Sequence, residues 1–343
     1  MRVGVLTGGG DAAGLNAAIR AVTLLGARRG YEVAGIIDGW AGLLPGGSSR
    51  PLSAEDVSGA LRAGGTMLGS SRTNPLATED GLSLVIEGLE QHRIDGLVAI
   101  GGDDTLSVAA ALAARSVPVV GIPKTVDFDL DVTDYCIGFD SAVAVVAEAL
   151  DRLATTGASH HRTMVLEVMG RDTGWLAIMG ALAGGADLVA LPEFPLALGE
   201  IIAHAEGRRA GGASSSLVVV AEGAQIEGLD PGPSTQEVDA FGHAPLRRRA
   251  IGERLADAIN DATGIDTRAT VLGHVQRGGS PVASDRIWPS RLGIAAIDAL
   301  ASGRGGVCAA VVGAQPTEVP LADVVRTQKR VPEDLYRSFC AIS

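Results

Sequence analysis

Short, continuous apolar runs recur along the chain, and glycine and aspartate follow several of them. Val3–Thr7 precedes Gly8–Asp11, and Gly96–Ile100 precedes Gly101–Asp103. Between the runs, apolar residues recur at helical spacing, as in Leu15–Gly30. Strands that are apolar throughout are buried on both faces, as in a parallel sheet covered by helices. The pattern predicts an α/β fold, with further strands at Glu32–Ile37, Val117–Ile122, Thr163–Val168, Leu188–Leu191, Leu217–Ala221 and Ala269–Leu272.

Length, charge and cysteine usage narrow the class of protein. The 343 residues indicate two α/β domains or one large one. A net charge of −12 argues against nucleic acid as the main partner, although an acidic chain still binds anions where its cations gather. The cysteines, Cys136, Cys308 and Cys340, are widely spaced, as is typical of reduced thiols. Because we find neither a signal peptide nor an apolar segment of membrane-spanning length, we expect a cytoplasmic protein without a membrane partner.

Two glycine turns follow predicted strands, at Gly8–Asp11 and at Gly101–Asp103. Backbone amides of such turns, together with the start of a helix, attract phosphate. Glycines also occur in tight turns for structural reasons alone, and Asp103 is equally suited to capping the next helix. An aspartate at a strand end is a good Mg²⁺ ligand, so these turns indicate a phosphate and magnesium site.

The segment that follows the Val117–Ile122 run is unusually polar for a strand end. It contains Lys124, Thr125, Asp127 and Asp129. If the segment is extended, side-chain alternation places the hydroxyl and the two carboxylates on one side. One carboxylate can then act as the general base toward a sugar hydroxyl.

Several cations lie at the ends of apolar runs and beside glycines. Arginine is suited to bidentate phosphate binding, although each of these residues alone is typical of a protein surface. The histidine of the group stands between apolar residues and is as typical of a buried core as of a ligand site. The group consists of Arg72, Arg162, Arg171, Arg268, His274 and Arg277.

Together these segments resemble the phosphofructokinase family, in order and at compatible spacing along nearly the whole chain. The matching segments are Gly8–Asp11, Gly101–Asp103, Lys124–Asp127, Glu167–Arg171 and Leu272–Gly279. The resemblance implies two similar Rossmann-like domains, with parallel-rich sheets covered by helices and the active site in the interdomain cleft. Residues 1–138 and about 276–326 would bind the phosphoryl donor, and residues 139–275 and about 327–343 the sugar phosphate. A homodimer or homotetramer is also implied, because the family's equivalents of Arg162 and Arg268 reach in from a neighbouring subunit.

The resemblance also implies a role for each matching position. Asp127 resembles the general base that takes the proton from the 1-hydroxyl, with Thr125 beside it, and Arg171 resembles the residue that steadies the transferring phosphoryl group. Asp103 resembles the Mg²⁺ ligand. The donor-binding residues implied are Gly10, Arg72, Asp104 and Lys124. The substrate-binding residues implied are Thr125, Val126, Asp127, Asp129, Arg162, Met169, Gly170, Arg171, Glu222, Arg268, His274, Val275, Gln276 and Arg277.

Two positions bear on the phosphoryl donor. ATP-using members of the family carry glycine at the place of Asp104, whereas pyrophosphate-using members carry aspartate there and lysine at the place of Lys124. A carboxylate adds bulk and negative charge where a nucleotide would pass, and an ammonium group suits compact pyrophosphate. We therefore expect reversible, Mg²⁺-dependent conversion of fructose 6-phosphate and pyrophosphate to fructose 1,6-bisphosphate and phosphate, a glycolytic step.

Two departures from the family pattern leave alternatives open. Phe128 stands where asparagine is usual, and Asp172 stands where histidine or asparagine is usual. The alternatives are an ATP-dependent 6-phosphofructokinase, a paralogue that acts on another ketose phosphate such as sedoheptulose 7-phosphate, and a non-catalytic sugar-phosphate sensor. The presence of Asp103, Asp127 and the complete arginine set disfavours the sensor.

Overall fold

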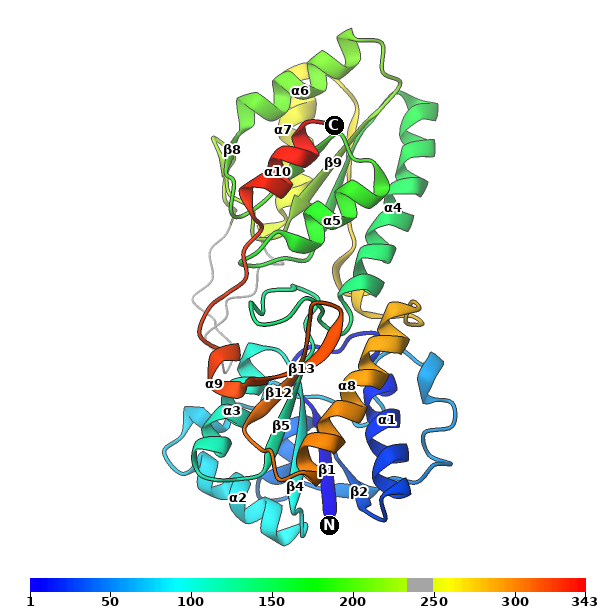
Figure 1. The fold of residues 1–343 in the computed structure, drawn as a ribbon. Helices are drawn as coiled ribbons and strands as arrows, with labels where there is room; N and C mark the ends of the chain where they lie inside the picture. The colour runs from blue at the N-terminus through cyan, green and yellow to red at the C-terminus, as the bar shows by residue number, and fades with distance from the viewer. Residues whose placement is uncertain (233–248) are drawn as a thin grey trace. The chain divides into compact units, whose positions relative to one another are not determined.

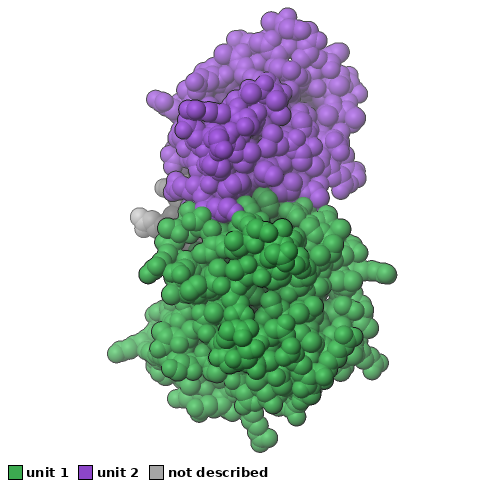
Figure 2. All heavy atoms as spheres, in the orientation of Figure 1, with its two compact units in different colours: residues 1–141, 239–243, 277–328 green, residues 142–238, 244–276, 329–343 purple. Residues whose placement is uncertain are grey.

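The computed structural model describes residues 1–232 and 249–343, which divide into two compact units. Among the described residues, unit 1 contains residues 1–141 and 277–328, and unit 2 contains residues 142–232, 249–276 and 329–343. Figure 1 shows the elements of each unit, and Figure 2 distinguishes the units by colour. Each unit is therefore assembled from segments that are far apart in the sequence.

Unit 1 is built on a seven-stranded sheet with the order β13-β12-β5-β4-β1-β2-β3. The inner strands are parallel: β1 (Arg2–Thr7), β2 (Glu32–Ile36), β4 (Gly96–Gly101), β5 (Val119–Pro123) and β12 (Val307–Val312). The edge strands β3 (Ser49–Pro51) and β13 (Gln315–Pro320) run antiparallel to their neighbours. The expected parallel sheet is confirmed for the inner strands, whereas β3, β12 and β13 were not predicted.

The antiparallel edge at β13 has a local cause. Two residues, Gly313 and Ala314, connect β12 to β13, and both have positive φ, at 57° and 62°. Two-residue hairpins of this twist require positive φ at both positions. So short a connection cannot make the crossover that a parallel neighbour needs, and the chain turns back on itself.

Helices cover both faces of this sheet (Figure 1). Side-chain alternation along β4 directs Val98 and Ile100 into the apolar cluster under α1 (Leu15–Arg28) and α8 (Ser284–Ala301). Leu97 and Ala99 face the opposite cluster, under three further helices. Those helices are α2 (Gly81–Gln91), α3 (Asp103–Ala114) and α9 (Leu321–Val324), and short 3₁₀ helices occur at η1 (Gly39–Leu43), η2 (Ala60–Arg62) and η3 (Pro75–Ala77).

Unit 2 is built on a four-stranded sheet in which all neighbours are parallel. Its order is β11 (Thr267–Val271), β6 (Thr163–Val168), β9 (Ser216–Ala221) and β7 (Leu188–Ala190). Helix α7 (Ile251–Thr263) packs on β11 and β6, and α5 (Trp175–Gly184) packs on β9 and β7. The remaining elements are α4 (Phe139–His160), α6 (Leu198–Ala210), α10 (Glu333–Cys340), η5 (Gly273–Arg277) and the paired short strands β8 (Leu196–Ala197) and β10 (Ile226–Glu227).

The polar motifs follow the carboxyl ends of parallel strands in both units, as the α/β pattern predicts. In unit 1, Gly8 follows β1, Asp103 follows β4 and Lys124 follows β5. In unit 2, Met169 follows β6 and Glu222 follows β9. Within residues 1–232 and 249–343, no helix is both long enough and apolar enough to cross a lipid bilayer.

A buried carboxylate fixes the connection between β5 and α4 in unit 1. Asp285, in the first turn of α8, is fully buried. It accepts hydrogen bonds from the Tyr135 hydroxyl, from the Gly138 N–H at 2.8 Å, and from the N–H and Oγ of Ser141 at 2.8 and 2.6 Å. Because these donors flank the start of α4 at Phe139, one side chain sets where this helix begins.

We expect Asp285→Ala to lower the free energy of unfolding by about 3–5 kcal/mol, because buried donors would lose their acceptor. Urea denaturation would measure this loss. Asp298→Ala is the matched control: Asp298 lies on the same helix but is 44% exposed in an ion pair with Arg29, and its loss should cost less than about 1 kcal/mol. Equal effects of the two substitutions would contradict the structural role of Asp285.

Candidate active site

Three loops that follow neighbouring parallel strands of unit 1 meet at Lys124. Its backbone N–H donates to the Gly101 carbonyl at 2.9 Å, which joins the loops after β5 and β4. Its ammonium group donates to the Gly10 carbonyl at 2.6 Å, which joins the loop after β1. The side chain is only 3% exposed. A buried ammonium group is costly unless charged or polar partners compensate it, so its surroundings are informative.

Charged side chains surround the Lys124 ammonium group. Burial lowers the pKa of Lys124 to about 8, and the nearby Arg277 contributes to the decrease. The carboxylates of Asp127, Asp103 and Asp11 oppose it by favouring the charged form. The structure thus brings together Lys124, Asp127, Asp103, Gly10 and Arg277, all of which were predicted to belong to a site.

The turn after β1 also holds a guanidinium group. Arg277 Nη1 donates to the Asp11 carbonyl at 3.0 Å. A Cβ added at Gly10 would lie 2.5 Å from Arg277 Nη1 and 2.8 Å from its Cζ, so a larger residue there would displace the guanidinium group. Arg277 was predicted in the sugar-phosphate set, and the structure places it in unit 1 beside the turn predicted to bind the donor.

Asp103 and Asp104 occupy the first turn of α3. The residue that caps this helix is Gly102, which has no side chain, so the alternative that Asp103 caps the helix is wrong. Asp103 is exposed and lies at the positive end of the helix, and Asp104 is half-buried. Mg²⁺ usually takes one or two carboxylates and completes its shell with phosphate and water oxygens, a role for which Asp103 is available.

The segment Thr125–Asp129 does not continue as an extended strand. Phe128 has a φ of 55°, in the left-handed region, so the predicted side-chain alternation is wrong beyond Asp127. The Thr125 hydroxyl accepts a hydrogen bond from the Asp127 N–H at 3.0 Å. The Phe128 ring stacks on Phe139, with 4.5 Å between centroids and 16° between planes, and packs against the apolar core. Phe128 is therefore a packing residue whose backbone turns the segment.

Asp127 and Asp129 remain close enough to influence each other. Burial raises the pKa of Asp129 to about 7, and the charges of Asp127 and Asp103 contribute to the increase. The side chain of Gln328 donates to Asp129 at 3.4 Å and opposes the increase. Asp129 is therefore protonated more readily than an ordinary aspartate, which limits the negative charge beside Asp127. No sequence motif pointed to Gln328, because it joins the segment from 199 residues away.

Arg72 is exposed in a loop that is tied to the turn after β1. Ser70 Oγ donates to the Gly9 carbonyl at 2.5 Å, and the Gly9 N–H donates to the Ser71 carbonyl at 3.2 Å. These bonds fix the backbone immediately before Arg72. The loop carrying this predicted donor-binding residue thus lies beside Gly10 in the same unit.

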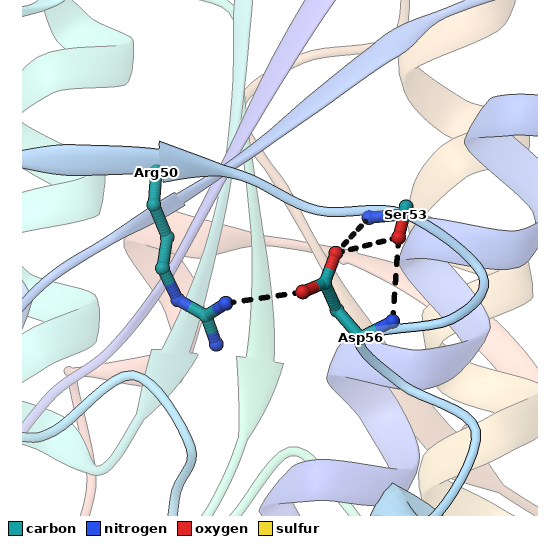
Figure 3. A network of polar contacts seen from close by, with 3 residues as sticks. All are labelled: Arg50, Ser53 and Asp56. Carbon is teal, nitrogen blue, oxygen red and sulfur yellow. Dashed lines mark hydrogen bonds and ion pairs between the residues drawn. The ribbon is translucent and has the colours of Figure 1, made fainter.

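A surface network orders the chain upstream of that loop (Figure 3). Asp56 accepts hydrogen bonds from the Ser53 N–H at 2.8 Å and from its Oγ at 2.6 Å, and the Arg50 guanidinium lies 3.5 Å away. The bonds from Ser53, followed by the charge of Arg50, lower the pKa of Asp56. The Ser-x-x-Asp spacing is a capping pattern, and this network was not predicted.

In unit 2, a second group gathers at the carboxyl ends of β6 and β9. The Met169 N–H donates to Gln276 Oε1 at 3.3 Å, and the buried Gln276 amide donates in turn to the Gly273 carbonyl at 3.0 Å. The Gly170 carbonyl accepts from Gly223 at 2.9 Å, next to Glu222. Gly170 has a φ of 136°, a conformation that favours glycine. Met169, Gly170, Arg171, Glu222 and Gln276 are thus brought together.

The two residues before Gln276 are exposed. Val275 is 67% exposed, and His274 is also exposed. The alternative that His274 is a core histidine is therefore wrong, and its ring is available to solvent or to a ligand.

Two predicted arginines lie at the opposite edge of the same sheet. Arg162 and Arg268 both pair with Asp266, at 2.5 and 2.9 Å, at the amino ends of β6 and β11. Strands rise about 3.3 Å per residue, so β6 separates these arginines from Arg171 by roughly 15–20 Å. Within one chain, Arg162 and Arg268 therefore do not join the group at Met169–Arg171.

The chain is similar to known proteins over its whole length. A family model described as phosphofructokinase matches residues 2–300. A pyrophosphate–fructose 6-phosphate 1-phosphotransferase of Amycolatopsis methanolica is 48% identical over 337 residues, 98% of each chain. An ATP-dependent 6-phosphofructokinase of Mycobacterium bovis is 43% identical over 342 residues, again 98% of each. The solved structure of phosphofructokinase from Saccharomyces cerevisiae superposes with a TM-score of 0.79 at 31% identity, over 95% of this chain and 45% of the yeast chain.

The titration of Lys124 is directly measurable, because Lys124 and Lys329 are the only two lysines of the chain. After labelling with ¹³C-lysine, we expect two NMR signals, of which the one missing from Lys124→Met titrates with a pKa of about 8. The cause is the burial of the ammonium group. A midpoint above pH 10 for that signal would mean that Lys124 is solvated and would contradict the site described above.

Proposed function

The chain belongs to the phosphofructokinase family, and on that premise we propose that it transfers a phosphoryl group between pyrophosphate and fructose 6-phosphate. The observation that carries the proposal is the buried ammonium group of Lys124, bonded to the Gly10 carbonyl at 2.6 Å. A cation at this depth, beside a glycine turn, suits a small and highly charged donor. The 48% identical relative named for pyrophosphate supports the same donor.

The side chains at the start of α3 support pyrophosphate rather than a nucleotide as the phosphoryl donor. Asp103 and Asp104 place two carboxylates in the first turn of the helix. One carboxylate suffices to hold Mg²⁺, and the second adds bulk and negative charge where a nucleotide donor would pass. Lys124, with a pKa of about 8, is mostly charged at pH 7, and a bound anion would stabilise that charge further.

Asp127 is the proposed general base. Its carboxylate takes the proton from the 1-hydroxyl, the hydroxyl oxygen bonds to the terminal phosphorus of pyrophosphate, and the P–O–P bond breaks to release phosphate. The Thr125 hydroxyl positions the Asp127 backbone. The raised pKa of Asp129 lessens the negative charge beside Asp127. Bound Mg²⁺, held by Asp103, would neutralise negative charge on the phosphates.

The sugar phosphate is assigned to unit 2 and to a second copy of the chain. Met169, Gly170, Arg171, Glu222, His274, Val275 and Gln276 are the proposed contacts within one chain. The position of Arg162 and Arg268 at the far edge of the sheet supports a role toward a neighbouring subunit. In the free chain, both arginines pair with Asp266. At a subunit contact, the same guanidinium groups can bind phosphate bidentately.

The donor is tested by measuring fructose 1,6-bisphosphate formation with pyrophosphate and with ATP in parallel. We expect turnover with pyrophosphate and at least ~100-fold less with ATP, because the Asp104 carboxylate opposes the nucleotide and the Lys124 ammonium group favours pyrophosphate. Asp104→Gly should raise the ATP rate, since it removes the second carboxylate. Asp127→Asn is the control: it should reduce turnover with either donor by about 10²–10⁴-fold.

ATP is the second candidate donor, because a 43% identical relative is named ATP-dependent. Turnover with ATP alone would exclude pyrophosphate and assign this second function. Binding of fructose 6-phosphate without turnover from either donor would instead favour a sensor.

Subunit sharing of the site is tested by mixing two inactive variants, Arg162→Ala and Arg171→Ala. In a symmetric dimer with random exchange, one site in each mixed dimer retains both arginines, so about a quarter of the wild-type activity should return. Size-exclusion chromatography would confirm that both variants assemble. A mixture that is no more active than the two variants measured separately would mean that each chain builds its site alone.

A further inference from the structure

The loop Met169–Gly174 joins β6 to α5 and carries Arg171. At its end, the Gly174 N–H donates to both carboxylate oxygens of Glu193, at 3.1 and 3.0 Å. Gly174 caps α5 but has no side chain with which to do so. Glu193, from the connection after β7, thus supplies a negative charge at the start of this helix.

The same carboxylate also binds the C-terminal segment. The Val331 N–H donates to Glu193 Oε1 at 3.1 Å. Next to this bond, Trp175 Nε1 donates to the Lys329 carbonyl at 2.9 Å, and the Lys329 ammonium group lies 5.5 Å from the centroid of the Trp175 ring. Residues 174 and 175 are therefore held by Glu193 and by the C-terminal segment together.

The contact at Gly174 is closely packed. A Cβ added there would lie 2.6 Å from Leu191 Cδ2 and 3.0 Å from Glu193 Oε2. The opposite end of the loop is fixed by Gln276 at Met169 and by Gly223 at Gly170. Because both ends of the loop are tied, the backbone at Arg171 has little freedom. Glu193 bonds the end of this loop and also the C-terminal segment, through Val331, 138 residues away.

We propose that Glu193 is a positioning residue for Arg171, which holds the Met169–Gly174 loop in its binding conformation by bonding Gly174 and Val331 at once. This rests on the proposed function in one respect, namely that Arg171 contacts the sugar phosphate. The physical effect is pre-organisation: a loop that is already ordered binds its ligand without the entropic cost of ordering. Docking of the C-terminal segment thereby raises the affinity for the sugar phosphate, although this segment contains no residue predicted to contact it.

Hydrogen exchange of the unliganded full chain tests the positioning without reference to any substrate. Glu193→Ala removes all three bonds, whereas Glu193→Gln keeps Oε1 as an acceptor. Phe194→Leu is the matched control, because it breaks the stack of Phe194 on Tyr336, at 4.5 Å, and leaves Gly174 untouched. We expect faster exchange over residues 170–175 in Glu193→Ala, a smaller change in Glu193→Gln, and a change confined to α10 in Phe194→Leu.

Steady-state kinetics separates positioning from a general loss of stability. In Glu193→Ala the KM for fructose 6-phosphate should rise about 10- to 100-fold, because Arg171 is misplaced, while the KM for pyrophosphate stays unchanged. Glu193→Gln should largely restore it. Phe194→Leu should lower the Tm and leave both KM values unchanged, since the KM is a property of the folded fraction.

Two results would overturn the assignment. One is unchanged exchange over residues 170–175 in Glu193→Ala. The other is an equal rise of the KM for fructose 6-phosphate in Glu193→Ala and Phe194→Leu. If the wild-type chain neither binds nor converts fructose 6-phosphate, the proposed function fails, and the exchange experiment still decides whether Glu193 positions the loop.

Discussion

The buried Lys124 ammonium group is the contact on which the candidate site of unit 1 depends. Through its side chain and its backbone, Lys124 bonds the loops after β1 and β4 to its own loop after β5. Its charge is compensated by Asp127, Asp103 and Asp11 and opposed by Arg277. Burial and Arg277 lower the pKa of Lys124, whereas the three carboxylates and the Gly10 carbonyl stabilise its charge and thereby hold the loops together.

The rest of the architecture places and restrains those loops. Parallel strands bring their carboxyl ends to one edge of each sheet. Hydrogen bonds from other segments then fix the loops that follow these strand ends. Asp285 sets the start of α4, Gln328 bonds Asp129, and Glu193 bonds Gly174. Asp285 and Gln328 reach their loops across 147 and 199 residues. Glu193 lies only 19 residues from Gly174, but its bond to Val331 spans 138 residues. These loops therefore depend on contacts between segments that are distant in the sequence.

Local pattern predicted much of this, and its limits have physical causes. The strand Thr163–Val168 was predicted with its observed bounds, because a parallel strand that is buried on both faces is mostly apolar, even though Thr163 and Glu167 interrupt this one. Lys124, Asp103 and Asp127 were predicted to belong to one site, because all three follow the carboxyl ends of parallel strands. The prediction of an extended segment was wrong at Phe128. Packing of its ring on Phe139 outweighs the preference of a bulky residue for negative φ. Glu193 and Gln328 were not found, because long-range hydrogen bonds leave no spacing in the sequence.

The most direct test of the central claim is calorimetric binding of methylenediphosphonate, a pyrophosphate analogue that is not hydrolysed, in the presence of Mg²⁺. We predict that it binds the wild-type chain, that its affinity falls at least ~10-fold in Lys124→Met because an ammonium–phosphate contact is lost, and that a non-hydrolysable ATP analogue binds neither. Equal affinity of methylenediphosphonate for the two chains, or tighter binding of the ATP analogue to the wild type, would contradict the account of Lys124 as the group that selects the donor.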